Sequence, residues 1–426
     1  VAVVAQKGAA TVTFAQATGL GPDSEVSGSP AVGDDTITLF DLSGNGVKDP
    51  TKSAPPAVPS LDRLAGSNVV VVAATNAKTD DGNAARDLRV VAGADATLDT
   101  GVAGRDILLL GGANAYSKLL TSSLTAGDDV TVVAQGGDAT VTLAKATGAA
   151  LLTGGQGDSE TVGSPALPDT VALLDASSGT VKDPTNATQT IKGLLSSNVV
   201  VAASGKADVT GTVTATTAFR DLKVAAGTDA TLAFGQAGRD LTVLAGGNAG
   251  SSLSLIAGDD VAVVAGRTGA GTATVTFAEA TGLKLDGSNA EDSEAVANAA
   301  APDTVKLFDL SGVTAVVDPS STALTGITGL ELSNVVVAAA TDALVMTAKA
   351  NATASPQVAR DVRVSAGNNA TLTQGDANRD ILLLATGLTA GGKAESVDLP
   401  VSIALPSGLA AHLKAGDDVA VVAQKG

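Results

Sequence analysis

Several residue types on which common protein functions depend are absent or nearly absent from this sequence. Among its 426 residues there is no Cys and no Trp, and Tyr, His and Met occur once each. Without Cys, the chain cannot be a disulfide scaffold, hold a metal through thiolates or use a cysteine nucleophile. With only 2 % aromatic residues, it also offers few of the platforms on which enzymes and lectins hold sugars.

Basic residues and long apolar runs are scarce as well. The formal net charge is −18, which argues against a nucleic-acid partner because phosphate binding needs a basic patch. The longest apolar runs, such as residues 69–74, are far shorter than the roughly 18 residues that cross a bilayer, so no membrane span is predicted. The chain is nevertheless 44 % hydrophobic, with many Val, Leu and Ile residues, which argues against disorder.

What the sequence does contain is repetition. The junction Ala-Gly-Asp-Asp-Val occurs three times and divides the chain into unit one (1–129), unit two (130–260) and unit three (261–418). Residues 1–8 then recur unchanged as residues 419–426, which we interpret as the start of the next superrepeat. We therefore expect a segment of a very long tandem array, or a subunit that polymerises with itself end to end or laterally.

Within each unit a shorter period is visible. The two Arg-Asp dipeptides of a unit stand 19 residues apart, and Val-, Leu- and Ile-rich runs bounded by Gly, Asn, Asp and Thr recur with similar spacing. This pattern predicts an all-β parallel β-helix, or β-solenoid, of about 19–23 residues per turn. Asp380 and Asp418 are 38 residues apart, so we expect unit three to hold an extra turn near residues 381–414. Tandem β-sandwich extender domains are the alternative fold.

The segment Asp87-Leu-Arg-Val-Val-Ala-Gly-Ala-Asp-Ala-Thr-Leu98 resembles the repeats of filamentous-haemagglutinin-like bacterial surface proteins and adhesins. Residues 221–232 and 361–372 match the same pattern, and the resemblance covers less than half of the chain. It implies a right-handed parallel β-helix, secretion, and a role in a cell-surface structure or fibre.

Arginine is concentrated at these dipeptides, since six of the ten arginines directly precede Asp. If turns stack about 4.8 Å apart, these side chains form an ion-pair ladder, with Asp bonded to backbone amides at the corners. Taken as exposed, such pairs contribute about 0–1 kcal/mol each, so their main role would be to fix the register between turns. The predicted ladder consists of Arg86, Asp87, Arg105, Asp106, Arg220, Asp221, Arg239, Asp240, Arg360, Asp361, Arg379 and Asp380.

Paired acids at the unit junctions are candidate Ca²⁺ ligands, because hard cations prefer oxygen. No cofactor is required by the sequence, and solvated acidic turns are the alternative interpretation of these residues. The candidates are Asp128, Asp129, Asp259, Asp260, Asp417 and Asp418.

Catalysis is not predicted. The only histidine is His412, the only tyrosine is Tyr116, and the acidic motifs recur in all three units, whereas a catalytic site is needed once. We expect a structural extracellular protein that forms a rod, fibre, sheath or surface layer on a bacterial cell. An adhesin stalk or a module that binds surface glycans is the first alternative, and a polysaccharide-active β-helix enzyme is the second.

Overall fold

The structure is a computed structural model, and it confirms the predicted fold class. Its described residues contain strands and no helix, and the strands form parallel sheets of many members, as a parallel β-helix requires. None of the described residues therefore belongs to a helix that could cross a membrane. The described residues are 1–5, 8–18, 35–38, 60–64, 69–119, 121–148, 169–172, 190–194, 198–266, 269–283, 303–306, 326–330, 333–350, 359–385 and 412–423.

The chain divides into two compact units, which are described separately. The described residues up to Lys206 form the first compact unit, and those from Ala207 onward form the second. Each contains two parallel sheets. The first sheet of the first unit runs in the order β1 (Ala2–Ala5), β5 (Val69–Ala73), β7 (Leu88–Ala92), β9 (Ile107–Gly111), β12 (Val130–Ala134) and β17 (Val199–Ala203). In the second unit it runs β20 (Leu222–Ala226), β23 (Leu241–Ala245), β25 (Val261–Ala265), β29 (Ser333–Ala339), β31 (Ala359–Ala366), β33 (Ile381–Ala385) and β35 (Val419–Ala423).

The second sheet of each unit is built from longer strands, some of which are broken into two short pieces. In the first unit it contains β2 (Ala10–Ala17), β6 (Ala77–Ala84), β8 (Ala96–Ala103), β10 (Ala115–Ser117), β11 (Ser123–Ala126), β13 (Ala139–Val141) and β14 (Ala144–Ala146). In the second unit it contains β18 (Ala207–Val209), β19 (Thr216–Ala218), β21 (Ala230–Leu232), β22 (Gly235–Ala237), β24 (Ala249–Ala257), β26 (Ala273–Ala280), β30 (Ala343–Ala350), β32 (Ala370–Ala377) and β34 (His412–Ala415).

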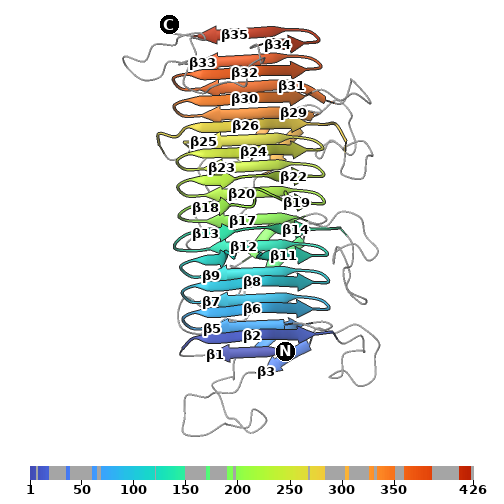
Figure 1. Ribbon diagram of the computed structural model, residues 1–426, viewed down its shortest axis with the longest axis vertical. Coiled ribbons are helices and arrows are strands. Elements are labelled where there is room, and N and C mark those ends of the chain that lie inside the picture. Colours follow the sequence, from blue (N-terminus) through green and yellow to red (C-terminus); the bar gives the residue numbers. More distant parts are fainter. Residues whose placement is uncertain are drawn as a thin grey trace. The chain divides into compact units, whose positions relative to one another are not determined.

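The 19-residue period corresponds to one rung of this architecture. The rung that begins with β7 has a strand of five residues, a corner of three, the eight-residue strand β8 and a second corner of three, after which β9 begins. Strand β9 pairs with β7 in register, with Ile107 opposite Leu88. In Figure 1 the strands of each unit accordingly lie one above the next. Each rung bonds only to the rungs before and after it, as in other solenoids.

Large aliphatic residues of the first sheet face small residues of the second. A Cβ atom placed on Gly82 or Gly101 would come within about 3 Å of the Leu88 side chain, so the core leaves no room for more than glycine there. Leu88, Leu98 and Ile107 have no exposed surface. Residues on the opposite face of the first sheet, such as Leu108, are equally buried, which accounts for the unbroken apolar runs.

Two kinds of insertion interrupt the rungs. An antiparallel hairpin follows each of the strands β2, β14 and β26 before the next rung starts. The hairpins are β3 (Asp35–Thr38) with β4 (Ser60–Leu64), β15 (Asp169–Ala172) with β16 (Thr190–Leu194), and β27 (Asp303–Lys306) with β28 (Gly326–Leu330).

The second kind of insertion lies near residues 381–414, where we expected an extra turn. That prediction is wrong. Strand β33 pairs directly with β35, with Ile381 opposite Val419, and β32 pairs directly with β34. The 38-residue interval therefore spans a single rung, and its additional residues fall between β33 and β34 in the sequence. Residues 386–411 of this segment lie outside the described residues.

Candidate functional site

Five of the six Arg-Asp dipeptides lie at one kind of corner, and the sixth, Arg360-Asp361, holds the equivalent register within the first residues of β31. We call this corner the Asp corner: the three residues that lead from a second-sheet strand to the next first-sheet strand, ending in Asp or Asn. Residues 85–87 and 104–106 are two such corners, between β6 and β7 and between β8 and β9. Because the rungs are in register, successive Asp corners stack and bring equivalent side chains together.

The second arginine of each pair binds the aspartate of the rung before it. Arg105 donates from Nε to Oδ1 of Asp87 over 2.8 Å and from Nη2 to Oδ2 over 2.7 Å. Arg239 makes the same two bonds to Asp221, and Arg379 makes them to Asp361. Such bidentate pairs are strong and directional. We call each of these three aspartates, together with the cations bonded to it, a hub.

Burial distinguishes these pairs from the exposed pairs that the sequence led us to expect. The side chain of Asp87 has no exposed surface, and that of Arg105 is 11 % exposed. Both charges have therefore left water almost completely, which is unfavourable unless each finds a partner. The Arg105–Asp87 and Arg239–Asp221 pairs are therefore part of the protein interior, whereas Arg379 of the third pair is 38 % exposed.

A further cation at each hub was missed by the sequence analysis. Arg89 lies two residues after Asp87, and its Nη2 donates to Asp87 Oδ2 over 3.1 Å. Arg363 makes the equivalent bond to Asp361, and Lys223 holds the same position after Asp221. Alternate residues of a strand point to the same side, so the spacing Arg-Asp-x-Arg/Lys was the signal that could have revealed this partner.

These neighbours lower the carboxyl pKa at two of the three hubs, whereas at the third hub burial dominates and raises the pKa of Asp361 above its ordinary value. Burial would raise the pKa of the Asp87 carboxyl, but the positive charges of Arg105, Arg89 and Arg86 lower it to about 2. Arg239 and Lys223 likewise overcome burial and lower the pKa of Asp221 to about 2. Burial lowers the pKa of Lys223 itself to about 8.

A second chain of hydrogen bonds runs through the Asp corners. The carboxylate of one corner accepts the backbone N–H of the next: Asp240 N donates to Asp221 Oδ1 over 3.3 Å, and Asp380 N does the same to Asp361. The last two residues of the Asp corners repeat in a cycle of four rungs: two corners end in Arg-Asp, the third in Asp-Asp and the fourth in Asn.

The asparagine rung has a physical explanation. At the Asp-Asp corner no arginine stands before the second aspartate, so another donor is needed. Asn198 supplies it, because its backbone N and side-chain Nδ2 both donate to Asp129 Oδ1, over 2.8 and 3.0 Å. Asn334 makes the same two bonds to Asp260. A neutral amide thus follows each pair of acids.

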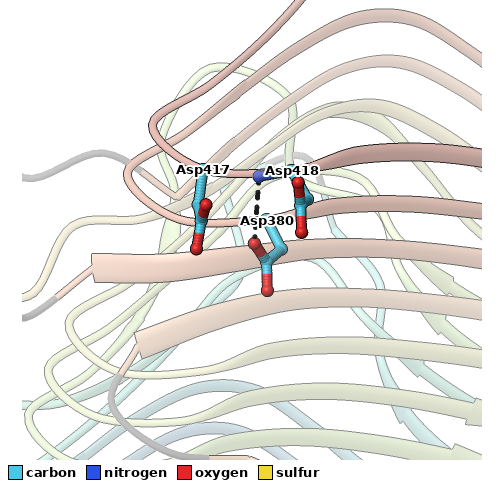
Figure 2. Close-up of side chains that lie close together, drawn as sticks. All are labelled: Asp380, Asp417 and Asp418. Carbon is cyan, nitrogen blue, oxygen red and sulfur yellow. Dashed lines mark hydrogen bonds between the residues drawn. The ribbon is translucent and has the colours of Figure 1, made fainter.

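The candidate Ca²⁺ ligands fall into two groups. Asp128, Asp129, Asp259 and Asp260 are buried in the interior corners, whereas Asp417 and Asp418 are exposed. The latter two lie beside Asp380, and one carboxylate oxygen from each of the three falls within 4.8 Å of the others. Figure 2 shows this cluster, with the backbone N–H of Asp418 bonded to Asp380 Oδ1. Three carboxylates could contribute to a hard-cation site, although Ca²⁺ takes six to eight oxygen ligands.

The opposite corner carries its own polar ladder, which the sequence analysis did not identify. Asn114 Nδ2 donates to Asp95 Oδ1 over 2.8 Å, and Asp138 N donates to Asn114 Oδ1 over 2.8 Å. In the second unit, Asn248 N donates to Asp229 Oδ1 over 2.9 Å. At both corners of the rung, therefore, Asp and Asn side chains accept hydrogen bonds from backbone N–H groups of the next rung.

His412 and Tyr116, which occur once each, lie on second-sheet strands. His412 is the exposed first residue of β34, and it pairs with Gln374. Tyr116 lies in β10, with Lys118 Nζ 3.1 Å from the centre of its ring.

Comparison with protein-family models, curated proteins and solved structures finds no match for this chain.

Proposed function

We propose that the chain is a structural repeat protein that forms a rod, fibre, sheath or surface layer outside a bacterial cell. The observation that carries this proposal is the recurrence of one buried hub. Asp87, Asp221 and Asp361 occupy equivalent corners, and each binds an arginine from the following rung. The recurrence of the same carboxylate–arginine pair once in each unit supports a scaffold, since a catalytic centre would be needed only once.

Two further properties favour this role. A solenoid in which each rung contacts only its neighbours can lengthen without needing a larger core. The formal charge of −18 would keep such molecules soluble and mutually repelling until cations screen them. The partner that suits this role is the protein itself, either as further repeats or as further copies.

The proposed scaffold requires no metal ion. The interior carboxylates of Asp129 and Asp260 already accept hydrogen bonds from asparagine, so we expect a chelator to leave the melting temperature unchanged. A clear fall in melting temperature with EDTA, reversed by Ca²⁺, would instead assign the acidic corners to calcium.

Localisation is the direct test of the function. Antibodies against this chain should label the outside of intact cells that make it, and material sheared from the cells should contain it as thin filaments. Labelling confined to the cell interior would contradict the proposal. Loss of labelled cells from a glycan-coated surface when the antibody is added would favour the adhesin or glycan-binding alternative.

A further inference from the structure

The second sheet of the second unit carries a row of charged residues whose sign alternates from rung to rung. The row occupies one register position of the strands β26, β30, β32 and β34, which lie one above the next (Figure 1), and consists of Glu279, Lys349, Asp376 and Lys414. On β26, β30 and β32 the residues before and after the row are buried, so its side chains lie on the outer face of the sheet. We call these four residues the charged row.

A second row runs beside it on the same face. It lies two positions earlier on each strand and consists of Phe277, Thr347, Gln374 and His412. Lys349 Nζ lies 5.4 Å from the centre of the Phe277 ring, and Thr347 Oγ1 donates to Gln374 Oε1 over 3.3 Å. Charged, polar and aromatic groups therefore share one outer face of the sheet.

The order of signs in the charged row is complementary to its own reverse. From β26 to β34 the charges are negative, positive, negative and positive, so the reversed order is positive, negative, positive and negative. A half-turn about an axis along the strand direction, placed between β30 and β32, produces this reversal in a second copy. Glu279 of each copy then faces Lys414 of the other, and Lys349 faces Asp376. Such a two-fold contact uses the same surface on both chains.

The charged row also distinguishes this arrangement from a parallel one. A half-turn about the stacking direction of the rungs would reverse the strand direction and place the charged row opposite the second row. The charges would then face Phe277, Thr347 and their neighbours. In the antiparallel arrangement each row faces itself, so Thr347 meets Gln374 and the Phe277 ring meets His412. Like-charge and unmatched contacts cost several kcal/mol, which favours the antiparallel arrangement.

We propose that this face is a lateral contact between two copies of the chain, packed antiparallel about the two-fold axis between β30 and β32. The inference rests on the proposed structural function and names a contact through which copies associate side by side. Only a surface with the same rung spacing can match alternating charges along its length, and a second copy has that spacing. Four rungs form a small patch, so a single contact should be weak.

A carbodiimide, which couples carboxylates directly to amines, tests the arrangement in the native chain. Within one chain Glu279 and Lys414 stand three rungs apart, or about 14 Å, which is too far for a direct amide bond. A cross-link between these two residues must therefore join two copies. We expect it in mass spectra of a mixture of ¹⁵N-labelled and unlabelled chains, as peptides that combine one labelled and one unlabelled part. Absence of this cross-link would overturn the proposal.

Two charge reversals test the pairing between Lys349 and Asp376. Lys349→Glu brings an acid opposite Asp376 of the other copy, and Asp376→Lys brings a base opposite Lys349. Each variant alone should associate at least tenfold more weakly than the native chain in sedimentation experiments. An equimolar mixture of the two should recover association, because the new acid of one then faces the new base of the other. Lys145→Glu, the same reversal at an exposed position of β14 in the first unit, is the control and should leave association unchanged.

Circular dichroism should show that all three variants keep the native strand content. A mixture that associates no better than its components would overturn the antiparallel contact, as would a native chain that stays monomeric or an equal effect of Lys145→Glu. If the contact fails in this way while antibodies still label the outside of cells, the structural function stands and only this mode of assembly is wrong. Labelling confined to the cell interior would contradict the function whether or not the chains associate.

Discussion

At the scale of single residues, the hub aspartates explain how a narrow core holds so many charges. A buried carboxylate is costly alone, yet Asp87 is bonded to Arg105 and Arg89 from two directions. Breaking such a pair costs more than the pair contributes, because it leaves the other charges buried and uncompensated. The ladder therefore penalises any shift in register more strongly than it stabilises the correct one.

The first prediction concerns the charge of this hub. Asp87→Asn keeps the size of the side chain but removes the buried carboxylate that Arg105 and Arg89 share, and it leaves Arg105 with Asp106 alone, so we expect a loss of about 3–5 kcal/mol in unfolding free energy. Asp81→Asn, at an exposed position of β6, is the control and should change stability by less than about 0.5 kcal/mol. Urea unfolding followed by circular dichroism measures both, and equal effects would contradict a buried hub.

The pH dependence of this difference follows from the pKa of Asp87. Its folded value of about 2 lies below the ordinary 3.8, so its stabilising contribution is present above about pH 4 and is lost as the pH falls toward 2. The difference in unfolding free energy between the native chain and Asp87→Asn should therefore stay constant from pH 7 to 4 and shrink below pH 4. A gap that closes at pH 5 would show that the carboxyl is not held ionised.

Lys223 gives a pH dependence of the same direction as Asp87, but in the alkaline range. Burial lowers its pKa from 10.5 to about 8, so between these values the unfolded chain binds more protons and stability rises with pH. Over this pH range the unfolding free energy should rise by on the order of 3 kcal/mol. Lys223→Arg, which copies the residue at position 89, stays charged and should abolish the rise. If the unfolding free energies of the native chain and Lys223→Arg change in parallel with pH, the lowered pKa of Lys223 is not the cause of the rise.

At the scale of the elements, the rung is a strand pair joined by corners that allow very close approach. A Cβ atom on Gly238 would lie 1.9 Å from the carbonyl oxygen of Phe219 in the rung before it. That atom belongs to the backbone and cannot move aside without separating the two rungs. Glycine at this corner therefore reflects rung spacing, in addition to turn conformation.

Gly238→Ala should consequently destabilise the second unit by more than about 2 kcal/mol, since it forces backbone atoms apart. Gly269→Ala is the control, because a Cβ atom there would have no neighbouring atom within 4 Å, and we expect little effect. Hydrogen exchange should show the loss of protection centred on the strands that flank residues 219 and 238, namely β19, β20, β22 and β23. A loss spread evenly over both units would contradict a local clash.

The elements also show what the sequence could and could not predict. The spacing of Arg86 and Arg105 predicted the rung because one rung contains one copy of each corner. The same arithmetic failed at Asp380 and Asp418, since an interval of 38 residues fits two turns as well as one turn with an insertion. The burial of the ladder was also missed, because a charged dipeptide beside glycine has the sequence signature of an exposed turn.

At the scale of the whole molecule, the sequence cycle of four rungs connects local chemistry to the long repeat. Each of the three units of the sequence contributes one Asp-Asp corner, one hairpin insertion, one Asn corner and two Arg-Asp corners. The insertion enters at the neutral Asn corner, where no buried arginine has to be held by its neighbours on both sides. An array built in this way can be extended by whole cycles without creating a new kind of contact.

Cryo-electron microscopy of the isolated chain tests the central claim most directly, since it shows whether each compact unit consists of stacked parallel rungs. We expect a regular spacing of about 4.8 Å between the strands of each unit. Beads of about 40 Å joined by narrow linkers would contradict the account and favour separate β-sandwich domains.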